Sequence, residues 1–312
     1  MQELEQLAAA VRAAPGFEAK RELAVLARVA SPPDGDDAAL VPHGDGFLVV
    51  CGEALHPAFV CSDPYAAGAA AVVTNVADVR AMGGRPLALV DMLVSPDRDH
   101  AAAVLDGLSW AADLLGVDVV GGHLTIGHEP ALSASCTGFA QRPLRSRDAR
   151  PGDALLAAFA LEGRYRGETN FFSALRDRAP ERLRDDGEAL VEVAAAGLAN
   201  AARDVSMPGV AGSLLQLLEA CGCGAGLDLE RLPRPQAVPV ERWLVTFPSF
   251  GFLLAVPPER VKEAAEPFAR RGLACTECAR LDDSGVLRLV AGGREAPVWD
   301  LGREPFTGLG RG

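Results

Sequence analysis

Short apolar runs, bounded by glycine, proline or charged residues, alternate along the first half of this chain with alanine-rich amphipathic stretches. The apolar runs predict buried strands, and the stretches with apolar residues at every third or fourth position predict helices. The first half therefore predicts three helices and five strands. The expected helices are 18–30, 64–82 and 100–115, and the expected strands are 38–41, 47–51, 86–95, 118–125 and 131–140.

Helix-breaking and capping residues fix several of these boundaries. Pro32 and Pro33 end the first helix, because proline lacks the backbone N–H that a helix interior requires. Asp63 is a favourable N-cap for the helix that begins at 64. Gly83 and Gly84 close that helix, as glycine does at many helix C-termini.

A second alternating pattern follows the polar, arginine-rich run at 141–153, which predicts a boundary between two domains, 1–145 and 146–312. Strands and helices alternate without the regular repeat of a parallel βαβ sheet, so the fold class is mixed α/β (α+β). The second half predicts strands at 153–161 and 286–293, helices at 188–204, 209–220 and 261–271, and two strand segments within 243–256 that Pro248, Ser249 and Gly251 interrupt.

Composition and charge narrow the class of protein. The chain has 312 residues, of which 49% are apolar and 23% charged, which is typical of a globular protein with about two domains. A net charge of -12 argues against nucleic acid as a partner, because binding to a phosphate backbone depends on cationic side chains. No apolar stretch approaches a membrane span and no signal pattern opens the chain, so we expect a cytoplasmic protein without a membrane partner.

The seven cysteines favour reduced thiols, because their number is odd and their spacing is scattered. Cys221 and Cys223 form a CxC pair, and Cys275 and Cys278 form a CxxC pair. A zinc site built from both pairs is the alternative. We favour small buried hydrophobes, since both pairs lie in apolar surroundings without a nearby histidine.

Acidic residues at the ends of apolar segments are the most informative feature. Asp36 and Asp37 follow Gly35, Glu53 follows a predicted strand, and Asp78 lies within the second predicted helix. Carboxylates gathered in this way, beside glycines that let phosphates approach the backbone, predict a site for Mg²⁺ and a nucleotide. The alternative for the aspartate pair is an ordinary turn.

Two further candidates have simpler alternatives. Lys20 is one of only two lysines, against 28 arginines, so its compact ammonium group is of interest, although a solvated helix lysine is the simpler interpretation. His123 follows two glycines at the end of a predicted strand, where it is either a site residue or part of a turn. The chain has no P-loop, and GCGAG at 222–226 follows a predicted helix, so it marks a helix terminus and not a dinucleotide fingerprint.

Several motifs together resemble one superfamily. They are GDDAAL at 35–40, NVADVRAMGG at 75–84, GGH at 121–123, RPGD at 150–153 and FPSFGFLL at 247–254. In this combination the chain resembles the superfamily of aminoimidazole ribonucleotide (AIR) synthetase, thiamine-monophosphate kinase, selenophosphate synthetase and the hydrogenase maturation factor HypE. It is most similar to the AIR synthase-related branch of the sll0787 type, and the resemblance covers most of the chain.

The resemblance implies a two-domain PurM-like architecture. Residues 1–145 would bind ATP and Mg²⁺ and form a homodimer, and residues 146–312 would close over the nucleotide and a small-molecule substrate. The implied metal ligands are Asp36, Asp37, Glu53 and Asp78; the implied nucleotide-binding residues are Asp36, Asp37, Asn75, Asp78, Gly83, Gly121, Gly122, Asp204 and Ser206; and the implied catalytic residues are Lys20 and His123.

The chain also departs from the relatives. Glu53 stands where they have aspartate, Met207 and Pro208 alter the start of a second-domain helix, and the reactive cysteine of selenophosphate synthetases is absent before Lys20. Selenophosphate synthesis is therefore disfavoured. The preferred function is an Mg-ATP-dependent kinase, or a ligase or cyclase that activates an oxygen by phosphorylation. The alternative is a nucleotide-binding partner with little turnover. The sequence leaves the substrate open.

Overall fold

The computed structural model describes residues 2–28 and 35–310, which form two compact units. The chain passes from unit 2 to unit 1 between Pro143 and Leu144, two residues before the predicted boundary at 145/146. Two segments are grouped differently from the predicted domains: the N-terminal segment up to Asp36 belongs to unit 1, and Arg178–Val191 belongs to unit 2. The first segment joins unit 1 because Ala8, Val11 and Phe17 are buried in its core. Unit 1 comprises Met1–Asp36, Leu144–Asp177 and Glu192–Gly312, and unit 2 comprises Asp37–Pro143 and Arg178–Val191.

Unit 2 is built on a five-stranded sheet in the order β1-β2-β5-β3-β4. Neighbouring strands are antiparallel except β3 and β4, which are parallel. The predicted hairpin is present, since His43 pairs with Gly46 across the turn between β1 and β2. The strands are β1 (Ala39–His43), β2 (Gly46–Ala54), β3 (Arg85–Ser95), β4 (Asp118–Ile126) and β5 (Ala131–Ala140).

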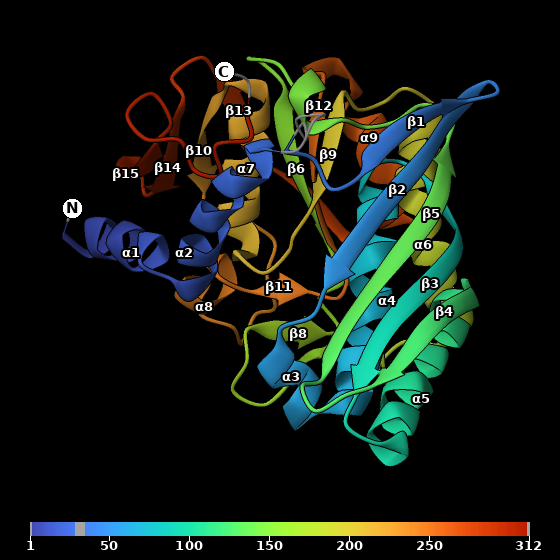
Figure 1. Ribbon diagram of the computed structural model, residues 1–312. Helices are drawn as coiled ribbons and strands as arrows, with labels where there is room; N and C mark the ends of the chain where they lie inside the picture. The colour runs from blue at the N-terminus through green and yellow to red at the C-terminus, as the bar shows by residue number, and fades with distance from the viewer. Residues whose placement is uncertain (1, 29–34, 311–312) are drawn as a thin grey trace. The chain divides into compact units, whose positions relative to one another are not determined.

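Helices α4 (Pro64–Ala81) and α5 (Arg98–Leu115) lie against one face of this sheet (Figure 1). The predicted start of α4 is confirmed, because Asp63 Oδ1 accepts a hydrogen bond from the Ala66 N–H at 3.0 Å. Its predicted end is confirmed too: Gly83 has a φ of 73° and donates its N–H to the Arg80 carbonyl. Gly83 thus acts as a helix cap, while its contact with a nucleotide stays a prediction. The short helix α3 (Pro57–Ser62) precedes α4.

The two faces of the sheet differ in exposure. Leu89 and Leu93 of β3 are 0% and 2% exposed on the helix side, whereas Val90 and Met92 between them are 36% and 44% exposed. This alternation follows the period of two along a strand. We call the side that carries Val90 and Met92 the open face, because no described helix of unit 2 covers it.

Unit 1 contains a seven-stranded sheet in the order β15-β14-β10-β13-β6-β12-β9 and a small sheet in the order β11-β8-β7. All residues of β6 and β12 are buried, as their uninterrupted apolar sequences predict. The strands are β6 (Ala154–Phe159), β7 (Arg164–Tyr165), β8 (Phe171–Ser173), β9 (Ala201–Asp204), β10 (Gly224–Asp228), β11 (Phe247–Pro248), β12 (Gly251–Val256), β13 (Ala274–Asp282), β14 (Val286–Ala291) and β15 (Arg294–Asp300).

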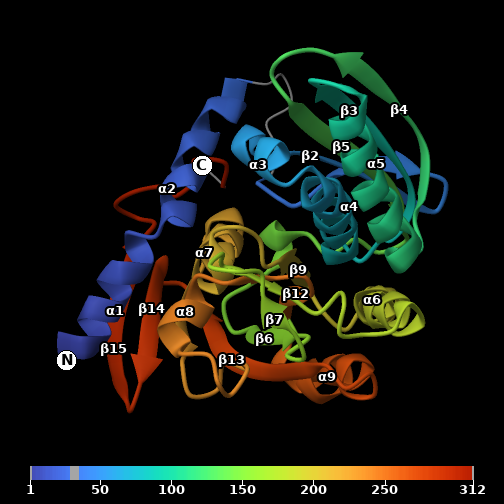
Figure 2. The same ribbon diagram turned by 90° about the horizontal axis from the view of Figure 1, so that it is seen from below.

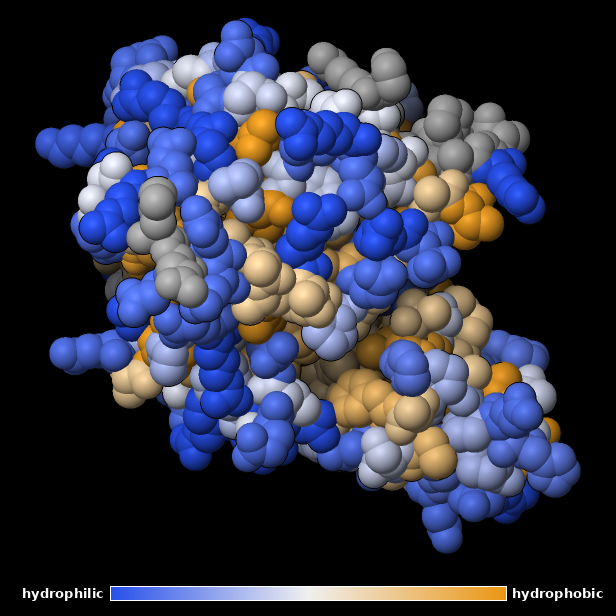
Figure 3. All heavy atoms as spheres, turned by 90° about the vertical axis from the view of Figure 1, so that its left-hand side faces the viewer, coloured by the Kyte–Doolittle hydropathy of each residue, from blue (hydrophilic) through white to orange (hydrophobic). Residues whose placement is uncertain are grey.

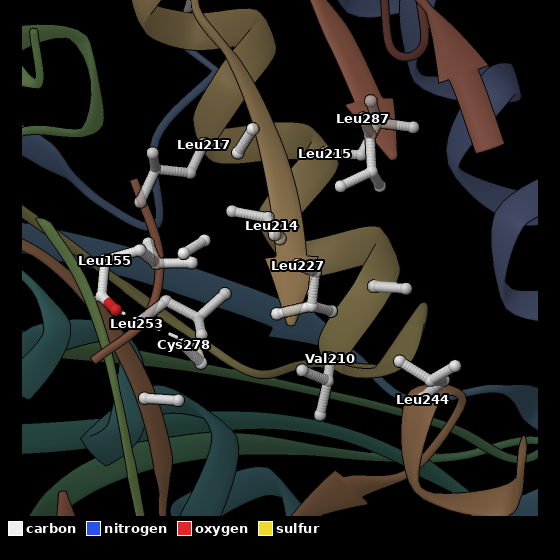
Figure 4. Packing of buried hydrophobic residues seen from close by; sticks show 14 of the residues in the cluster. Leu155, Val210, Leu214, Leu215, Leu217, Leu227, Leu244, Leu253, Cys278 and Leu287 are labelled. Carbon is white, nitrogen blue, oxygen red and sulfur yellow. Dashed lines mark hydrogen bonds between the residues drawn. The ribbon is translucent and has the colours of Figure 1, made fainter. Parts of the chain in front are cut away.

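Helix α7 (Gly209–Cys221) lies at the centre of the core of unit 1. Its residues Leu214, Leu215 and Leu217 are fully buried among leucines of β6, β10 and β12 (Figure 4). Helix α1 lies beside β15 (Figures 1 and 2). The remaining helical segments are α1 (Gln2–Arg12), α2 (Pro15–Arg21), η1 (Glu22–Arg28), η2 (Ser146–Asp148), α6 (Pro180–Ala195, which begins in unit 2), α8 (Val240–Leu244), η3 (Pro258–Arg260) and α9 (Val261–Ala269).

Three predicted elements were wrong in part. The helix predicted at 188–204 ends at Ala195, where Gly197 adopts a φ of 64°, and residues 201–204 instead form β9, paired with β12. Over the described residues 18–28, the helix predicted at 18–30 is divided into α2 and the 3-10 helix η1. Its predicted end, with Pro32 and Pro33, lies outside the described residues. Trp243, where we predicted the first strand segment of 243–256 to begin, lies in α8, and the strands begin at Phe247 and Gly251.

The described helices include none that is both long and apolar enough to cross a bilayer. On the face drawn in Figure 3, polar and charged residues predominate and apolar residues form small patches.

Candidate functional site

Two of the predicted metal ligands meet in unit 2. Carboxylate oxygens of Asp37 and Asp78 lie within 4.8 Å of each other. Asp78 belongs to α4 and is only 6% exposed, and Asp37 is half-buried just before β1. Two carboxylates this close repel each other, and hard oxygen donors of this kind suit a divalent cation such as Mg²⁺. The donor set therefore fits the predicted ion.

The charge of Asp78 also acts on the layer between α4 and the sheet. Burial raises the pKa of the Cys136 thiol to about 11, and the negative charge of Asp78 contributes to that shift. The pKa of Cys51, opposite Cys136 on β2, is raised for the same two reasons, burial first. Both thiols thus stay protonated and neutral beside the Asp78 carboxylate, so they add no negative charge to the layer between α4 and the sheet.

Asn75 lies one turn before Asp78 on α4 and is fully buried. Its Nδ2 donates to the Ala71 carbonyl at 2.8 Å, and its Oδ1 accepts from the Cys51 thiol at 3.3 Å. The structure therefore uses Asn75 to join α4 to β2, and its predicted nucleotide contact stays a prediction.

Glu53 is exposed near the end of β2. It lies two residues after Cys51, so both side chains point to the same side of the strand. Its charge contributes, as the smallest of the causes, to the raised pKa of Cys51, to which Asp78 also contributes. Glu53 is thus on the side of the sheet that carries Asp78, as a metal ligand would be.

Asp36 has a different setting from its neighbour Asp37, because it lies in unit 1. Its Oδ2 accepts a hydrogen bond from the Ser146 N–H at 2.9 Å, and its Oδ1 accepts one from the Ser146 hydroxyl at 2.7 Å. The structure thus places the two adjacent aspartates in different units.

Asp204 and Ser206 lie in unit 1 on the segment between β9 and α7. Asp204 is 7% exposed at the end of β9. The Ser206 N–H donates to the Ser213 hydroxyl at 3.0 Å, which orders the segment that leads into α7. Met207 on the same segment is 54% exposed.

Lys20 is half-buried on α2, one helical turn after Gly16 and therefore on the same face. At Gly16 this face approaches the segment before α7 so closely that an added Cβ would lie 2.5 Å from the Met207 carbonyl oxygen. Lys20 thus lies on the side of α2 that faces the segment of Ser206. This location fits both predicted roles, a site residue and a solvated lysine.

The GGH motif is not a turn, which was one of the two alternatives for it, and the strand predicted at 118–125 is present as β4. Gly121, Gly122 and His123 lie inside the edge strand β4, and the pairing with β3 shifts by one residue at Val120, as in a β-bulge. His123 pairs with Met92, so it lies on the open face, on the opposite side from α4. It lines a shallow pocket of about 500 Å³ there. The structure does not bring His123 together with Asp78, and its catalytic role stays a prediction.

Asp91 is a candidate that sequence reasoning missed. It is 6% exposed on the helix side of β3, and burial raises its pKa above the ordinary value. It pairs with Gly122, where an added Cβ would lie 2.2 Å from Asp91 Oδ1, so the glycine makes room for this carboxylate. The signal was a single acidic residue inside the apolar run PLALVDMLVS.

Comparison with known proteins identifies the family of the chain. Residues 35–140 match the family of the AIR synthase related protein, N-terminal domain, and residues 154–292 match the corresponding C-terminal domain. The uncharacterized protein sll0787 of Synechocystis sp. is 36% identical over 88% of this chain and 86% of its own length. The uncharacterized protein MJ0640 of Methanocaldococcus jannaschii is 30% identical over 78% and 76%. A thiamine-monophosphate kinase of Halobacterium salinarum is 33% identical over 74% and 82%.

Solved structures show the same fold. T. maritima PurL complexed with ATP superposes with a TM-score of 0.72 at 24% identity, covering 86% of this chain but only 46% of PurL. AaThiL complexed with AMPPCP and TMP superposes with a TM-score of 0.66 at 20% identity, covering 85% of this chain and 91% of its own. With both domains matched in order and 86% of the length of sll0787 covered, the chain belongs to the AIR synthase-related family of PurM-like proteins.

Proposed function

We propose that this chain is an Mg²⁺-dependent enzyme that uses ATP to phosphorylate an oxygen of a small metabolite. It would either end there as a kinase or use the phosphate to activate a carbonyl, whose oxygen then leaves as phosphate during ring closure or ligation. The observation that carries the proposal is the Asp37–Asp78 carboxylate pair, whose oxygens lie within 4.8 Å in a domain of the AIR synthase-related family. Relatives that bind ATP or carry the name of a kinase support it.

The side chains have distinct roles in this proposal. Asp37, Asp78 and Glu53 would hold Mg²⁺, which when bound neutralises phosphate charge. Phosphoryl transfer depends mainly on positioning and charge neutralisation, so carboxylates fixed on α4 and β2 suit it. Asp204 and Ser206 would contribute polar groups to the nucleotide, and Lys20 would stabilise the charge that develops during transfer.

A nucleotide-binding protein with little turnover is the second candidate. Glu53 and the exposed Met207 before α7 favour it, because both depart from the residues that the resemblance implies at these positions. The two candidates share Mg²⁺-dependent ATP binding and differ in product formation.

Two assays test the proposal in order. First, ATP should raise the melting temperature of the full chain only when Mg²⁺ is present, since a ligand at a hundredfold excess over Kd stabilises the native state by about 2.7 kcal/mol. No Mg²⁺-dependent rise would refute nucleotide binding. Second, ADP release should be measured with panels of hydroxyl- and amide-bearing metabolites. Binding without ADP release for any of them would favour the second candidate.

We also propose a homodimer in which the edge strand β4 of unit 2 pairs with a second copy. Val120, Leu124 and Ile126 of β4 are 65%, 47% and 57% exposed, and an exposed apolar edge strand is a common pairing surface. Light scattering should give a dimer mass. Val120→Lys should yield monomers, whereas the control Leu105→Lys, at a residue 40% exposed on α5, should leave the mass unchanged. A wild-type monomer at micromolar concentration would contradict this assembly.

A further inference from the structure

We infer that the two aspartates of the GDD motif have divided roles: Asp37 is a metal ligand, while Asp36 is a positioning residue that anchors the segment to Ser146 and Arg203. The inference rests on the proposed function for the role of Asp37. The role of Asp36 rests on contacts within unit 1 alone.

The contacts of Asp36 use both of its carboxylate oxygens. Oδ2 accepts from the Ser146 N–H at 2.9 Å and Oδ1 accepts from the Ser146 hydroxyl at 2.7 Å. Ser146 is fully buried at the first residue of η2, where a backbone N–H has no partner within the helix. Without Asp36, this N–H would be left buried and unsatisfied, which is costly. Asp36 therefore supplies the acceptor for the N–H of the first residue of η2.

Arg203 reinforces the same anchor from β9. It is 4% exposed, and its Nη1 donates to the Gly35 carbonyl at 2.8 Å and to the Ser146 hydroxyl at 3.4 Å. The Ser146 hydroxyl can thus accept from Arg203 while it donates to Asp36. Gly35 and Asp36 are held by one buried network, which fixes the backbone immediately before Asp37.

Adjacent residues with different partners need not respond alike to the same substitution. At position 36 asparagine can keep both hydrogen bonds: its Oδ1 accepts from the Ser146 N–H, and its amide donates to the Ser146 hydroxyl. At position 37 the carboxylate acts through its charge on a hard cation, which asparagine does not supply. The pair of positions therefore offers a matched comparison.

The test measures MgATP affinity by titration calorimetry and hydrogen exchange of the Ser146 amide, both on the full chain. Asp36→Asn should change the Kd for MgATP less than about fivefold, whereas Asp36→Ala should weaken it by about tenfold, as loss of an outer-shell partner does. Ser146→Ala should weaken binding less than Asp36→Ala, because it removes the hydroxyl but keeps the backbone N–H that donates to Asp36 Oδ2. The double variant should be no weaker than Asp36→Ala, since both changes act on one network. Asp37→Asn and Asp37→Ala should both weaken MgATP binding by more than tenfold.

Hydrogen exchange separates this inference from the proposed function, because it needs no nucleotide. The Ser146 amide should exchange faster in Asp36→Ala than in the wild type and at the wild-type rate in Asp37→Asn. Unchanged exchange in Asp36→Ala would overturn the anchoring role. Asp36→Asn as harmful to MgATP binding as Asp37→Asn would make Asp36 a second metal ligand and overturn the division of roles. Absence of MgATP binding in the wild type would refute the role of Asp37 and the proposed function, but not the anchor.

Discussion

Replacing Asp78 with asparagine removes one charge from the Asp37–Asp78 pair and leaves the shape of the side chain unchanged. In the absence of Mg²⁺ the two carboxylates repel each other, so the substitution should stabilise the metal-free protein. In its presence the same carboxylate holds the ion, so the substitution should abolish the gain from MgATP. The sign of the effect therefore reverses with the metal.

The structure sets the size of the metal-free effect. Two unit charges at most 4.8 Å apart repel by at least about 1 kcal/mol at an effective dielectric constant of about 80, and by at least about 3.5 kcal/mol at about 20. The lower end allows for Asp37, which is only half-buried, and the upper end for Asp78, which is 6% exposed. Relief of even 1 kcal/mol corresponds to a rise of about 2 °C or more in the melting temperature of units of this size.

Thermal unfolding in EDTA, in Mg²⁺ and in Mg²⁺ with ATP is the assay. Asp78→Asn should melt at least about 2 °C above the wild type in EDTA and show no rise with MgATP. Asp106→Asn is the control, because Asp106 is exposed on α5 of the same unit and should change neither result. If Asp78→Asn melts several degrees below the wild type in EDTA, Asp78 is a structural residue and the electrostatic reasoning fails.

Three further predictions follow from other parts of the molecule. Lys20→Arg should lower turnover by at least about tenfold, which corresponds to about 1.4 kcal/mol of activation free energy, with little change in ATP affinity. Wild-type turnover in both Lys20→Arg and Lys20→Ala would show that Lys20 is a solvated lysine. Glu219 of α7 accepts hydrogen bonds from the Thr307 N–H, the Thr307 hydroxyl and the backbone N–H groups of Phe306 and Gly308. Glu219→Gln should therefore lower the free energy of unfolding in urea by about 2 kcal/mol. An unchanged midpoint would contradict this. Because the pKa of Cys136 is raised to about 11 from an ordinary value of 9.0, its contribution to stability should be complete below pH 9 and be lost as the pH rises towards 11. Iodoacetamide at pH 8 should accordingly modify the exposed Cys61 and spare Cys136, as mass spectrometry can check.

Local sequence was sufficient for the elements whose signals are local. The uninterrupted apolar runs of β6 and β12 predict strands that are buried on both faces, and Asp63 and Gly83 mark the ends of α4. The residues 201–204 have no such signal. AARD is compatible with a helix, and it forms β9 because its backbone pairs with β12, which lies about 50 residues further along the chain.

The candidate site shows the same division. The sequence by itself determined which residue types are available: aspartates after Gly35, a carboxylate on α4 and glycines on β4. Only the tertiary structure decided that Asp36 binds Ser146, 110 residues away, while Asp37 lies beside Asp78. Motif spacing places residues along the chain, but the partner of a carboxylate is set by which distant backbone groups folding brings within hydrogen-bonding distance, and no local pattern encodes that.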